Sequence, residues 1–313
     1  MRRSLVAVVA VAVAIALPAC AGDVAEHATA SDPRPNAAAT GPSGTASPSP
    51  VGDAPTPVIP EPDAWIPGRP DALAVRLQGT WEARREAVRQ WVLTGDPGSW
   101  PPPDDLELLV LYEQRIYRVL AARDRLAVAV LDRLDGPLAA EARSNVRAGG
   151  ALYDHFSPLK KLPDYRTRPP EPADLLLRYF HKGERRFGVH WELLAAVMLI
   201  ETRMGRITSS SSAGAQGPMQ FIPSTWEVYG LGGDVHDEHD AILGAANYLS
   251  ASGSPGDDRA ALYHYNPVAA YVTAVMRYAN AMSGDPDLFY AYYNWQVFVR
   301  TRHGDVRLTG PGL

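Results

Sequence analysis

The stretch that most constrains the fold lies between residues 191 and 201 and reads WELLAAVMLIE. From Leu193 to Ile200 every residue is apolar, so a helix formed here has no polar face to turn toward water. A helix that is hydrophobic all round belongs inside a protein. We therefore expect a central buried helix with other helices packed around it, ending at the acidic Glu201.

Glu201 closes this helix in a position that favours chemistry. A carboxylate at the end of an apolar helix is poorly solvated, and the negative end of the helix dipole adds to the cost of ionising it. We expect a raised pKa, which is what a general acid needs near neutral pH. The competing interpretation is a structural ion pair with Arg203 or Arg206, because such pairs also perturb carboxylates. On the helix alone the two interpretations are equally good.

The chain before this helix is also predicted to be helical. Residues from Asp71 to about His155 carry apolar side chains at alternating three- and four-residue steps, typical of packed antiparallel helices: Leu109, Tyr112, Ile116, Val119, Leu126 and Val130. Gly136-Pro137 predicts a turn before a further helix. The region is interpreted as a helical hairpin packed on the following domain, with a partner-binding module as the alternative.

Proline-rich residues 161–172 mark a boundary, after which a second helical region begins. Pro172 suits a first helical turn, and Gly188 suits a helix end. Residues 295–308, with His303-Gly304-Asp305 between β-formers, predict a small terminal hairpin. The predicted fold class is all-α, or α+β at most. We assign residues 65–165 to a helical N-terminal region and 170–313 to a second domain.

The N-terminus has the layout of an export signal. Arg2 and Arg3 precede an apolar run from Leu5 to Leu17, which is too short to span a bilayer comfortably. Leu17-Pro18-Ala19-Cys20 resembles the lipobox of bacterial lipoproteins, which would place a lipid on Cys20. The alternative is ordinary signal cleavage at Ala19-Cys20-Ala21, which removes the cysteine. We assign residues 1–21 to the signal and 22–64, rich in Ala, Pro, Ser and Thr, to a disordered tether.

Composition excludes several classes of function. Cys20 is the only cysteine, so an internal disulfide and a cysteine-based metal cluster are excluded. The net charge is −5 and no dense Lys/Arg run occurs, so the electrostatic footprint of a nucleic-acid binder is missing. We expect no nucleic-acid partner.

The residues after Glu201 contain motifs that a ligand site would use. Ser209–Ser212 lead into AGAQGPMQF, a glycine-rich turn that brings backbone and the Gln220 amide close to a ligand. IPSTW then predicts a helix start with Ser224 or Thr225 near the cap. DAILGAANYL (240–249) and YHYNPVAAYVTAV (263–275) are amphipathic segments, and the second presents Tyr265 and Asn266.

In these blocks the sequence resembles the lytic transglycosylases with a lysozyme-like fold, above all the membrane-bound lytic transglycosylase B type and its Gram-positive relatives. The resemblance covers residues 172–280 and implies a lysozyme-like helical catalytic domain. It places the family's catalytic Glu at Glu201 and its substrate-binding Ser and Gln at Ser211 and Gln220. It places the family's Tyr and Asn at Tyr265 and Asn266. Because they adjoin the motif, the aromatic rings of Phe221 and Tyr265 are predicted to face sugar rings.

The chain also departs from the B type. That type has a longer insertion between the catalytic Glu and the Ser/Gly segment, and a calcium loop that LGGDVHDEHD does not reproduce. We interpret Asp234, Asp237 and Asp240 as a solvated helix-capping loop, and we read Asp237, Glu238 and Asp240 as surface charge. No metal and no cofactor are expected.

The resemblance implies cleavage of the β-1,4 bond between N-acetylmuramic acid (MurNAc) and N-acetylglucosamine (GlcNAc) in peptidoglycan. Glycosidases usually need two carboxylates, and no second acid has a setting like that of Glu201. The family resolves this through the substrate's own N-acetyl group and leaves a 1,6-anhydro end, while Tyr265 and Asn266 orient the acetamido group or the Glu. The alternatives are a hydrolytic muramidase and a non-catalytic wall-binding lipoprotein. Expected partners are glycan strands and the cell membrane through the lipid, with the protein on the outer face of the membrane or in the wall.

Overall fold

A computed structural model describes residues 58–313, and Ile59–Leu313 form one compact unit. The predicted signal, Cys20 and most of the predicted tether lie outside the described residues, so these assignments remain predictions. Residues 58–64, the end of that tether, contain no helix or strand. Arg115 donates hydrogen bonds to the carbonyl oxygens of Pro62 and Ala64 and so holds this end against the folded unit.

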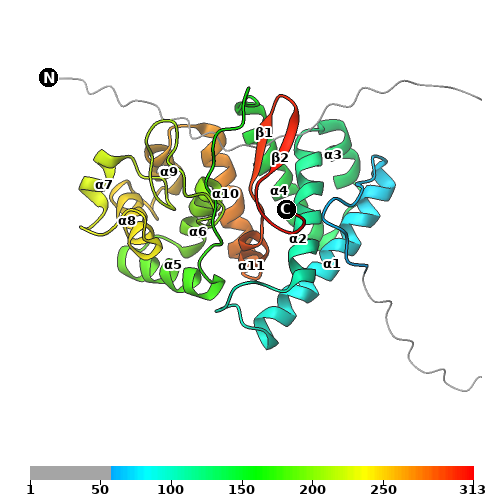
Figure 1. The fold of residues 1–313 in the computed structure, drawn as a ribbon, viewed down its shortest axis with the longest axis horizontal. Coiled ribbons are helices and arrows are strands. Elements are labelled where there is room, and N and C mark those ends of the chain that lie inside the picture. Colours follow the sequence, from blue (N-terminus) through cyan, green and yellow to red (C-terminus); the bar gives the residue numbers. More distant parts are fainter. Residues whose placement is uncertain (1–57) are drawn as a thin grey trace, which may run out of the picture. The chain divides into compact units, whose positions relative to one another are not determined.

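The described residues form helices and one small hairpin, which confirms the predicted fold class (Figure 1). The elements in chain order are α1 (Pro70–Thr94), α2 (Asp104–Ala121), α3 (Asp124–Leu131), α4 (Gly136–His155), α5 (Ala173–Phe187), α6 (Trp191–Thr202), α7 (Pro223–Tyr229), α8 (Glu238–Ala251), α9 (Asp258–Tyr265), α10 (Ala269–Gly284), α11 (Leu288–Tyr293), β1 (Phe298–Thr301) and β2 (Gly304–Arg307). Within residues 58–313, none of the helices has the length and apolar character needed to cross a membrane.

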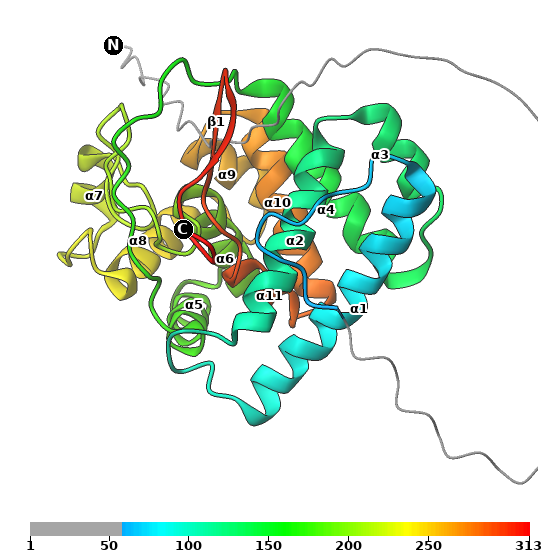
Figure 2. The same cartoon turned by 45° about the vertical axis from the view of Figure 1, so that its right-hand side comes forward.

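Helices α1 to α4 form the N-terminal region, in which α2 lies between α1 and α4. The predicted apolar seam is largely confirmed, because Leu109, Tyr112, Ile116 and Val130 are buried, whereas Val119 and Leu126 are half-buried. Helix α4 begins at Gly136, as the Gly-Pro pair predicts. It packs along α10 (Figure 2). Because Ile59–Leu313 form one compact unit, the division into two domains stays a prediction.

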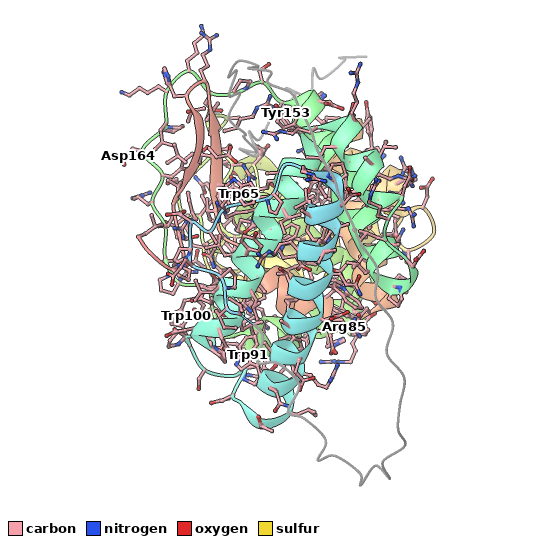
Figure 3. The ribbon with its side chains drawn as sticks, turned by 90° about the vertical axis from the view of Figure 1, so that its right-hand side faces the viewer. Trp65, Arg85, Trp91, Trp100, Tyr153 and Asp164 are labelled. Carbon is pink, nitrogen blue, oxygen red and sulfur yellow. The ribbon has the colours of Figure 1, made fainter. Side chains whose placement is uncertain are left out.

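Two further sets of contacts hold this region in place. The buried Arg84 guanidinium lies 3.1 Å from Glu113 and 2.7 Å from Glu141, which balances two carboxylates within the core. At the end of α1, the Trp91 ring contacts Tyr290 edge to face, with centroids 5.7 Å apart. Trp91 lies at the same end of the molecule as Trp100 (Figure 3). Aromatic contacts therefore fix the N-terminal region to α11.

Helix α6 is the centre of the second region, as its sequence predicts. Its residues from Leu193 to Thr202 are all buried, and α5, α8, α10 and α11 pack around it. Helix α5 ends at Gly188 in the left-handed conformation (φ 76°), which confirms the predicted stop. The buried helix thus carries its C-terminal acid into the interior of the unit.

Prolines set the helix bounds in two of the predicted segments. Helix α7 starts at Pro223 after Ile222, and neither Ser224 nor Thr225 caps it, because proline at the first position already supplies helical φ without needing a bond to its nitrogen. The amphipathic segment 263–275 contributes to two helices. Pro267 cannot continue a helix, so α9 ends at Tyr265, Asn266 is extended, and α10 begins at Ala269.

The predicted terminal hairpin is confirmed. Strands β1 and β2 are antiparallel, with Val299 opposite Val306. The backbone of Leu159 forms two hydrogen bonds with the hairpin. Its N–H donates to the Arg300 carbonyl oxygen at 2.8 Å, and its carbonyl oxygen accepts from the Arg302 N–H at 3.0 Å. The extended segment after α4 therefore runs beside the hairpin (Figure 1).

Candidate active site

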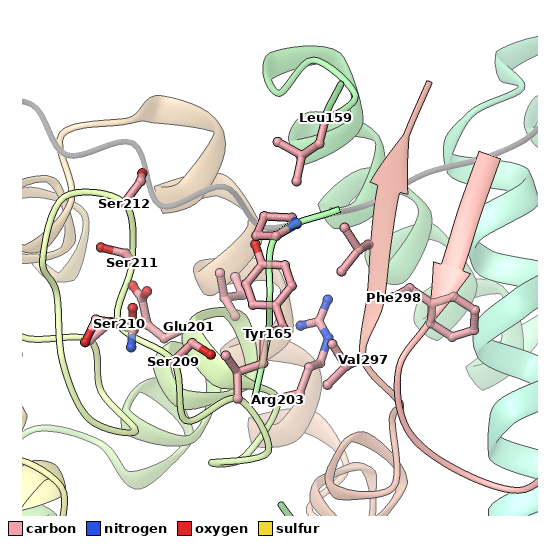
Figure 4. Close-up of a pocket in the computed structure, with 15 residues that line it drawn as sticks. Leu159, Tyr165, Glu201, Arg203, Ser209, Ser210, Ser211, Ser212, Val297 and Phe298 are labelled. Carbon is pink, nitrogen blue, oxygen red and sulfur yellow. The ribbon is translucent and has the colours of Figure 1, made fainter. Parts of the chain in front are cut away.

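A cavity of about 310 Å³ opens at the C-terminal end of α6 (Figure 4). Helix α6 supplies Ile200 and Glu201, and the turn after it supplies Arg203. The opposite wall comes from the extended segment and the hairpin. The lining residues are Leu159, Pro163, Tyr165, Ile200, Glu201, Arg203, Ile207, Ser209, Ser210, Ser211, Ser212, Gln220, Val297, Phe298 and Val299. Three predicted site residues, Glu201, Ser211 and Gln220, therefore share one cavity.

The Glu201 carboxyl is the chemically unusual group of this cavity. Glu201 is only 5% exposed. Burial raises the pKa of its carboxyl from 4.5 to about 8, because the ionised form is poorly solvated. The Tyr271 hydroxyl faces the Glu201 carboxyl and offsets part of this rise in pKa. The contact between the two groups does not meet the geometric criteria for a hydrogen bond. Glu201 Oε2 has no hydrogen-bond partner among the described residues. The Glu201 residue lines the cavity, and a protonated carboxyl in that position is suited to donate its proton to a ligand.

The structure does not support the ion-pair interpretation of Glu201. Among residues 58–313, no ion pair joins Glu201 to a cation. Arg203 donates to the Leu199 carbonyl oxygen, and Arg206 donates to the carbonyl oxygen of Tyr293 at 2.6 Å. Both guanidiniums are thus engaged with backbone at the helix end, and the carboxyl is left to the cavity.

The glycine-rich segment forms a tight loop beside Glu201. Ser211 Oγ accepts hydrogen bonds from the amides of Ala213 (3.3 Å) and Ala215 (3.0 Å), which fixes the loop from within. Gln220 adopts φ 51° and its side-chain Nε2 donates to the Gly217 carbonyl at 3.0 Å. The loop therefore holds the Ser211 and Gln220 side chains at the cavity wall through local hydrogen bonds.

Tyr265 and Asn266 do not line the cavity; they lie behind the loop. The Tyr265 hydroxyl donates to the Met219 carbonyl at 2.6 Å, so it holds the backbone next to Gln220. Burial and the nearby Glu201 carboxyl raise the pKa of Tyr265 well above its usual value. Asn266 is buried, and its Oδ1 has no partner among the described residues. The end of α9 thus supports the site from its inner side.

Phe221 is placed in the core. Its ring is buried and packs edge to face on Trp226, with centroids 5.0 Å apart, and on Tyr265 at 6.0 Å. It is not among the residues that line the cavity. Phe221 is therefore not proposed as a sugar contact. Its ring packs beneath the loop in the core.

The acidic segment before α8 is a helix cap, as predicted. Asp237 Oδ1 accepts from the Asp240 amide at 2.9 Å, and Asp240 Oδ2 accepts from the Asp234 amide at 3.0 Å. The prediction that Glu238 is a surface charge was wrong. Its side chain is buried and forms an ion pair with Arg168. Asp237, His239 and Asp240 place possible ligand atoms within 4.8 Å of one another. The carboxylates of Asp237 and Asp240 already accept hydrogen bonds from backbone amides. The expectation that no metal binds here remains a prediction.

Several residues of the site were missed by the sequence motifs. Tyr165, Val297 and Phe298 form part of the cavity wall, although they lie far from Glu201 in the chain. Tyr271 faces Glu201 from α10. Nothing local in the sequence marks these positions, because they reach the site through the packing of distant segments.

Comparisons with known proteins agree with the resemblance that the sequence shows. Residues 178–287 match the model of the transglycosylase SLT domain family. The membrane-bound lytic murein transglycosylase F of Thiobacillus denitrificans is 28% identical over 159 residues, which cover 47% of this chain and 33% of that protein.

The chain thus spans about a third of this relative's length. The comparisons do not separate the B type from other types, and no solved structure matches. The resemblance to lytic transglycosylases is confirmed at the level of a domain match, which covers residues 178–287.

Proposed function

We propose that the protein is a peptidoglycan lytic transglycosylase that uses Glu201 as its acid and its base. The observation that carries this proposal is the buried Glu201 carboxyl, with a pKa of about 8, at the wall of the cavity. Glu201 is the one acidic residue among the described residues that line this cavity. A single carboxyl fits a mechanism in which the substrate supplies the second group.

In the first step, protonated Glu201 gives its proton to the oxygen of the β-1,4 bond between MurNAc and GlcNAc. The bond from this oxygen to C1 of MurNAc breaks, and the MurNAc acetamido oxygen bonds to C1 in its place. Ser211 and Gln220 line the same cavity and offer hydroxyl and amide groups for holding the sugar. Tyr265 supports Gln220 by binding the Met219 carbonyl.

In the second step, ionised Glu201 takes the proton of the C6 hydroxyl of the same MurNAc. The C6 oxygen bonds to C1, the bond from the acetamido oxygen to C1 breaks, and a 1,6-anhydro ring forms. Glu201 is protonated again and ready for another cycle. Burial makes each protonation state accessible near neutral pH, because the pKa lies near 8.

The product of murein digestion tests this proposal. Purified sacculi are incubated with the protein, and the soluble fragments are weighed by mass spectrometry. The proposal expects fragments with anhydro ends, which are lighter than reducing ends by one water. Reducing ends would instead identify a hydrolytic muramidase. Intact sacculi with bound protein would identify a non-catalytic wall-binding protein.

We also propose that the protein works outside the cytoplasm and is held to the membrane by a lipid on Cys20. The predicted signal over residues 1–21, the lipobox-like stretch ending at Cys20, and the substrate class support this proposal. Replacing Cys20 by Ser should move most of the protein from the membrane fraction to the soluble fraction, as measured by immunoblotting of fractionated cells. An unchanged distribution would contradict lipid attachment at this residue.

The pKa of Glu201 predicts the pH dependence of cleavage. The free enzyme needs a protonated Glu201, so kcat/KM should stay level up to pH 8 and fall about tenfold per pH unit above it. The rate of fragment release from solubilised glycan, measured from pH 5 to 10, checks this. Circular dichroism at each pH separates titration from unfolding. A fall that begins near pH 5 would contradict the role of Glu201 as the acid.

A further inference from the structure

The cavity holds a cation that the proposed mechanism does not use. Arg203 follows the catalytic acid by two residues and adopts a left-handed conformation (φ 54°) that ends α6. Its residue is 8% exposed, yet it lines the cavity. In the close-up, its guanidinium lies between Tyr165 and Val297, on the opposite side of the cavity from the serines (Figure 4).

Arg203 has no acidic partner in the part of the chain that the structure describes. One nitrogen, Nη1, donates to the Leu199 carbonyl oxygen, and a guanidinium carries five N–H donors. Burial lowers the pKa of Arg203 to about 10, and the charges of Arg118 and Arg206 act in the same direction. The group remains a cation at neutral pH. A buried guanidinium with unused donors is costly unless an anion binds it.

The cavity's charges favour an anionic ligand. Glu201 is its one acidic lining residue and is mostly protonated below pH 8. The nearby acid Asp305 is already paired with Arg118, and Arg206 donates to the Tyr293 carbonyl oxygen, so the charge of Arg203 is not neutralised from within the described part of the protein. The remaining wall beside Arg203 is apolar and includes Leu159, Val297 and Val299. A ligand that carries a carboxylate next to methyl groups matches both properties.

We propose that Arg203 binds a carboxylate of the glycan substrate next to the bond that is cut, an inference that rests on the proposed function. MurNAc differs from GlcNAc by a lactyl ether on C3, which carries a methyl group and a carboxyl carbon. That carboxyl is a free carboxylate where the stem peptide is absent. It is an amide where the peptide is attached, and the peptide then offers carboxylates of its own. Arginine binds either kind of carboxylate in a bidentate manner.

Three substrates distinguish the two carboxylate sources. They are glycan with intact stem peptides, peptide-free glycan with free lactyl carboxylates, and the same peptide-free glycan with its lactyl groups converted to methylamides. Wild-type protein should cleave at least one carboxylate form about tenfold faster, in kcat/KM, than the methylamide, since charge-assisted hydrogen bonds give differences of this size. Preference for peptide-free glycan assigns the lactyl group, and preference for intact glycan assigns the peptide.

Arg203→Gln should remove this preference by slowing cleavage of the carboxylate form about tenfold and sparing the methylamide. Arg203→Lys should restore part of it, because lysine keeps the charge without the planar fork. The matched control is Arg166→Gln, which removes the same charge from an exposed position outside the cavity lining and should change nothing. An equal loss on every substrate would show that Arg203 only caps α6 and would overturn the proposal.

Binding measurements keep the proposal separate from the proposed function. Titration calorimetry of Glu201→Gln protein, with and without Arg203→Gln, gives the affinity for the carboxylate and methylamide glycans in the absence of cleavage. We expect the single variant to prefer the carboxylate and the double variant to bind both equally. If wild type cleaves nothing, the transglycosylase proposal fails while this titration still decides the role of Arg203. Equal binding of both glycans by the single variant overturns it.

Discussion

Glu201→Gln should lower the rate of murein cleavage by about a thousandfold or more. General acid–base catalysis typically contributes about 10²- to 10⁴-fold, and here one carboxyl serves as donor in one step and acceptor in the next. The amide has nearly the shape of the carboxyl, so glycan binding should persist. Release of soluble fragments from labelled sacculi measures the rate, and co-sedimentation with sacculi measures the binding.

The same helix provides the control. Glu192 lies in the first turn of α6, is half-buried and does not line the cavity. Glu192→Gln should therefore retain wild-type activity, although it makes the same side-chain replacement in the same helix. Wild-type activity in the Glu201→Gln protein would refute the assigned acid. Loss of both activity and sacculus binding would point to a damaged fold.

Glu201→Gln should also change how stability depends on pH. A glutamic acid in an unfolded chain has a pKa of about 4.3, and that of Glu201 in the folded protein is about 8. Between these values the folded state holds a proton that the unfolded state has lost, so the free energy of unfolding falls as pH rises through this window.

The amide has no such proton. Between pH 5 and 8, the variant should therefore lose about 3 kcal/mol less stability than the wild type. Urea unfolding at both pH values checks this result. Parallel pH profiles for the two proteins would show that Glu201 titrates normally.

The sequence predicts the parts of this protein that depend on local pattern. The buried α6 follows from an unbroken apolar run, and the end of α5 follows from Gly188, because both need only neighbouring residues. The loop with Ser211 and Gln220 is likewise predicted from a local feature, the glycine-rich segment between these two residues. Local pattern also gave a wrong prediction at Phe221. Its closeness to the motif suggested that the ring contacts a sugar, whereas the ring packs in the core.

The opposite wall of the cavity could not be predicted in this way. Tyr165 and Val297 meet Glu201 because the segment after α4 bonds to β1 through the backbone of Leu159. That pairing joins residues distant in sequence, and neither segment carries a side-chain pattern that identifies its partner. The sequence marks Arg203 only as a possible partner of Glu201, since the direction of its side chain depends on the left-handed turn at the helix end.

Gly217→Ala should unfold or disable the site, because two constraints meet at this residue. Its φ is 71°, a left-handed conformation that costs an alanine about 1–2 kcal/mol. A Cβ would also lie 1.8 Å from the Val235 carbonyl oxygen, which is backbone and cannot turn aside. Adding the cost of overpacking, about 1–3 kcal/mol, we expect a loss of about 2–5 kcal/mol in the free energy of unfolding.

Gly214→Ala separates these two constraints. Gly214 lies in the same loop with φ 81°, and a Cβ there would meet nothing within 4 Å. It should therefore lose only the conformational part, about 1–2 kcal/mol. Thermal and urea unfolding of both variants measure the difference, and equal losses would mean that Val235 yields to the methyl group.

Activity follows from the same geometry. The Gly217 carbonyl accepts the Gln220 side-chain amide at 3.0 Å, so a displaced Gly217 displaces Gln220 from the cavity wall. Folded Gly217→Ala protein should cleave murein at least about tenfold more slowly than Gly214→Ala, since positioning errors of about 1 Å have effects of this size or larger. Equal rates in the two variants would show that the glycan does not depend on the position of Gln220, and the site would then rest on Glu201 and its helix alone.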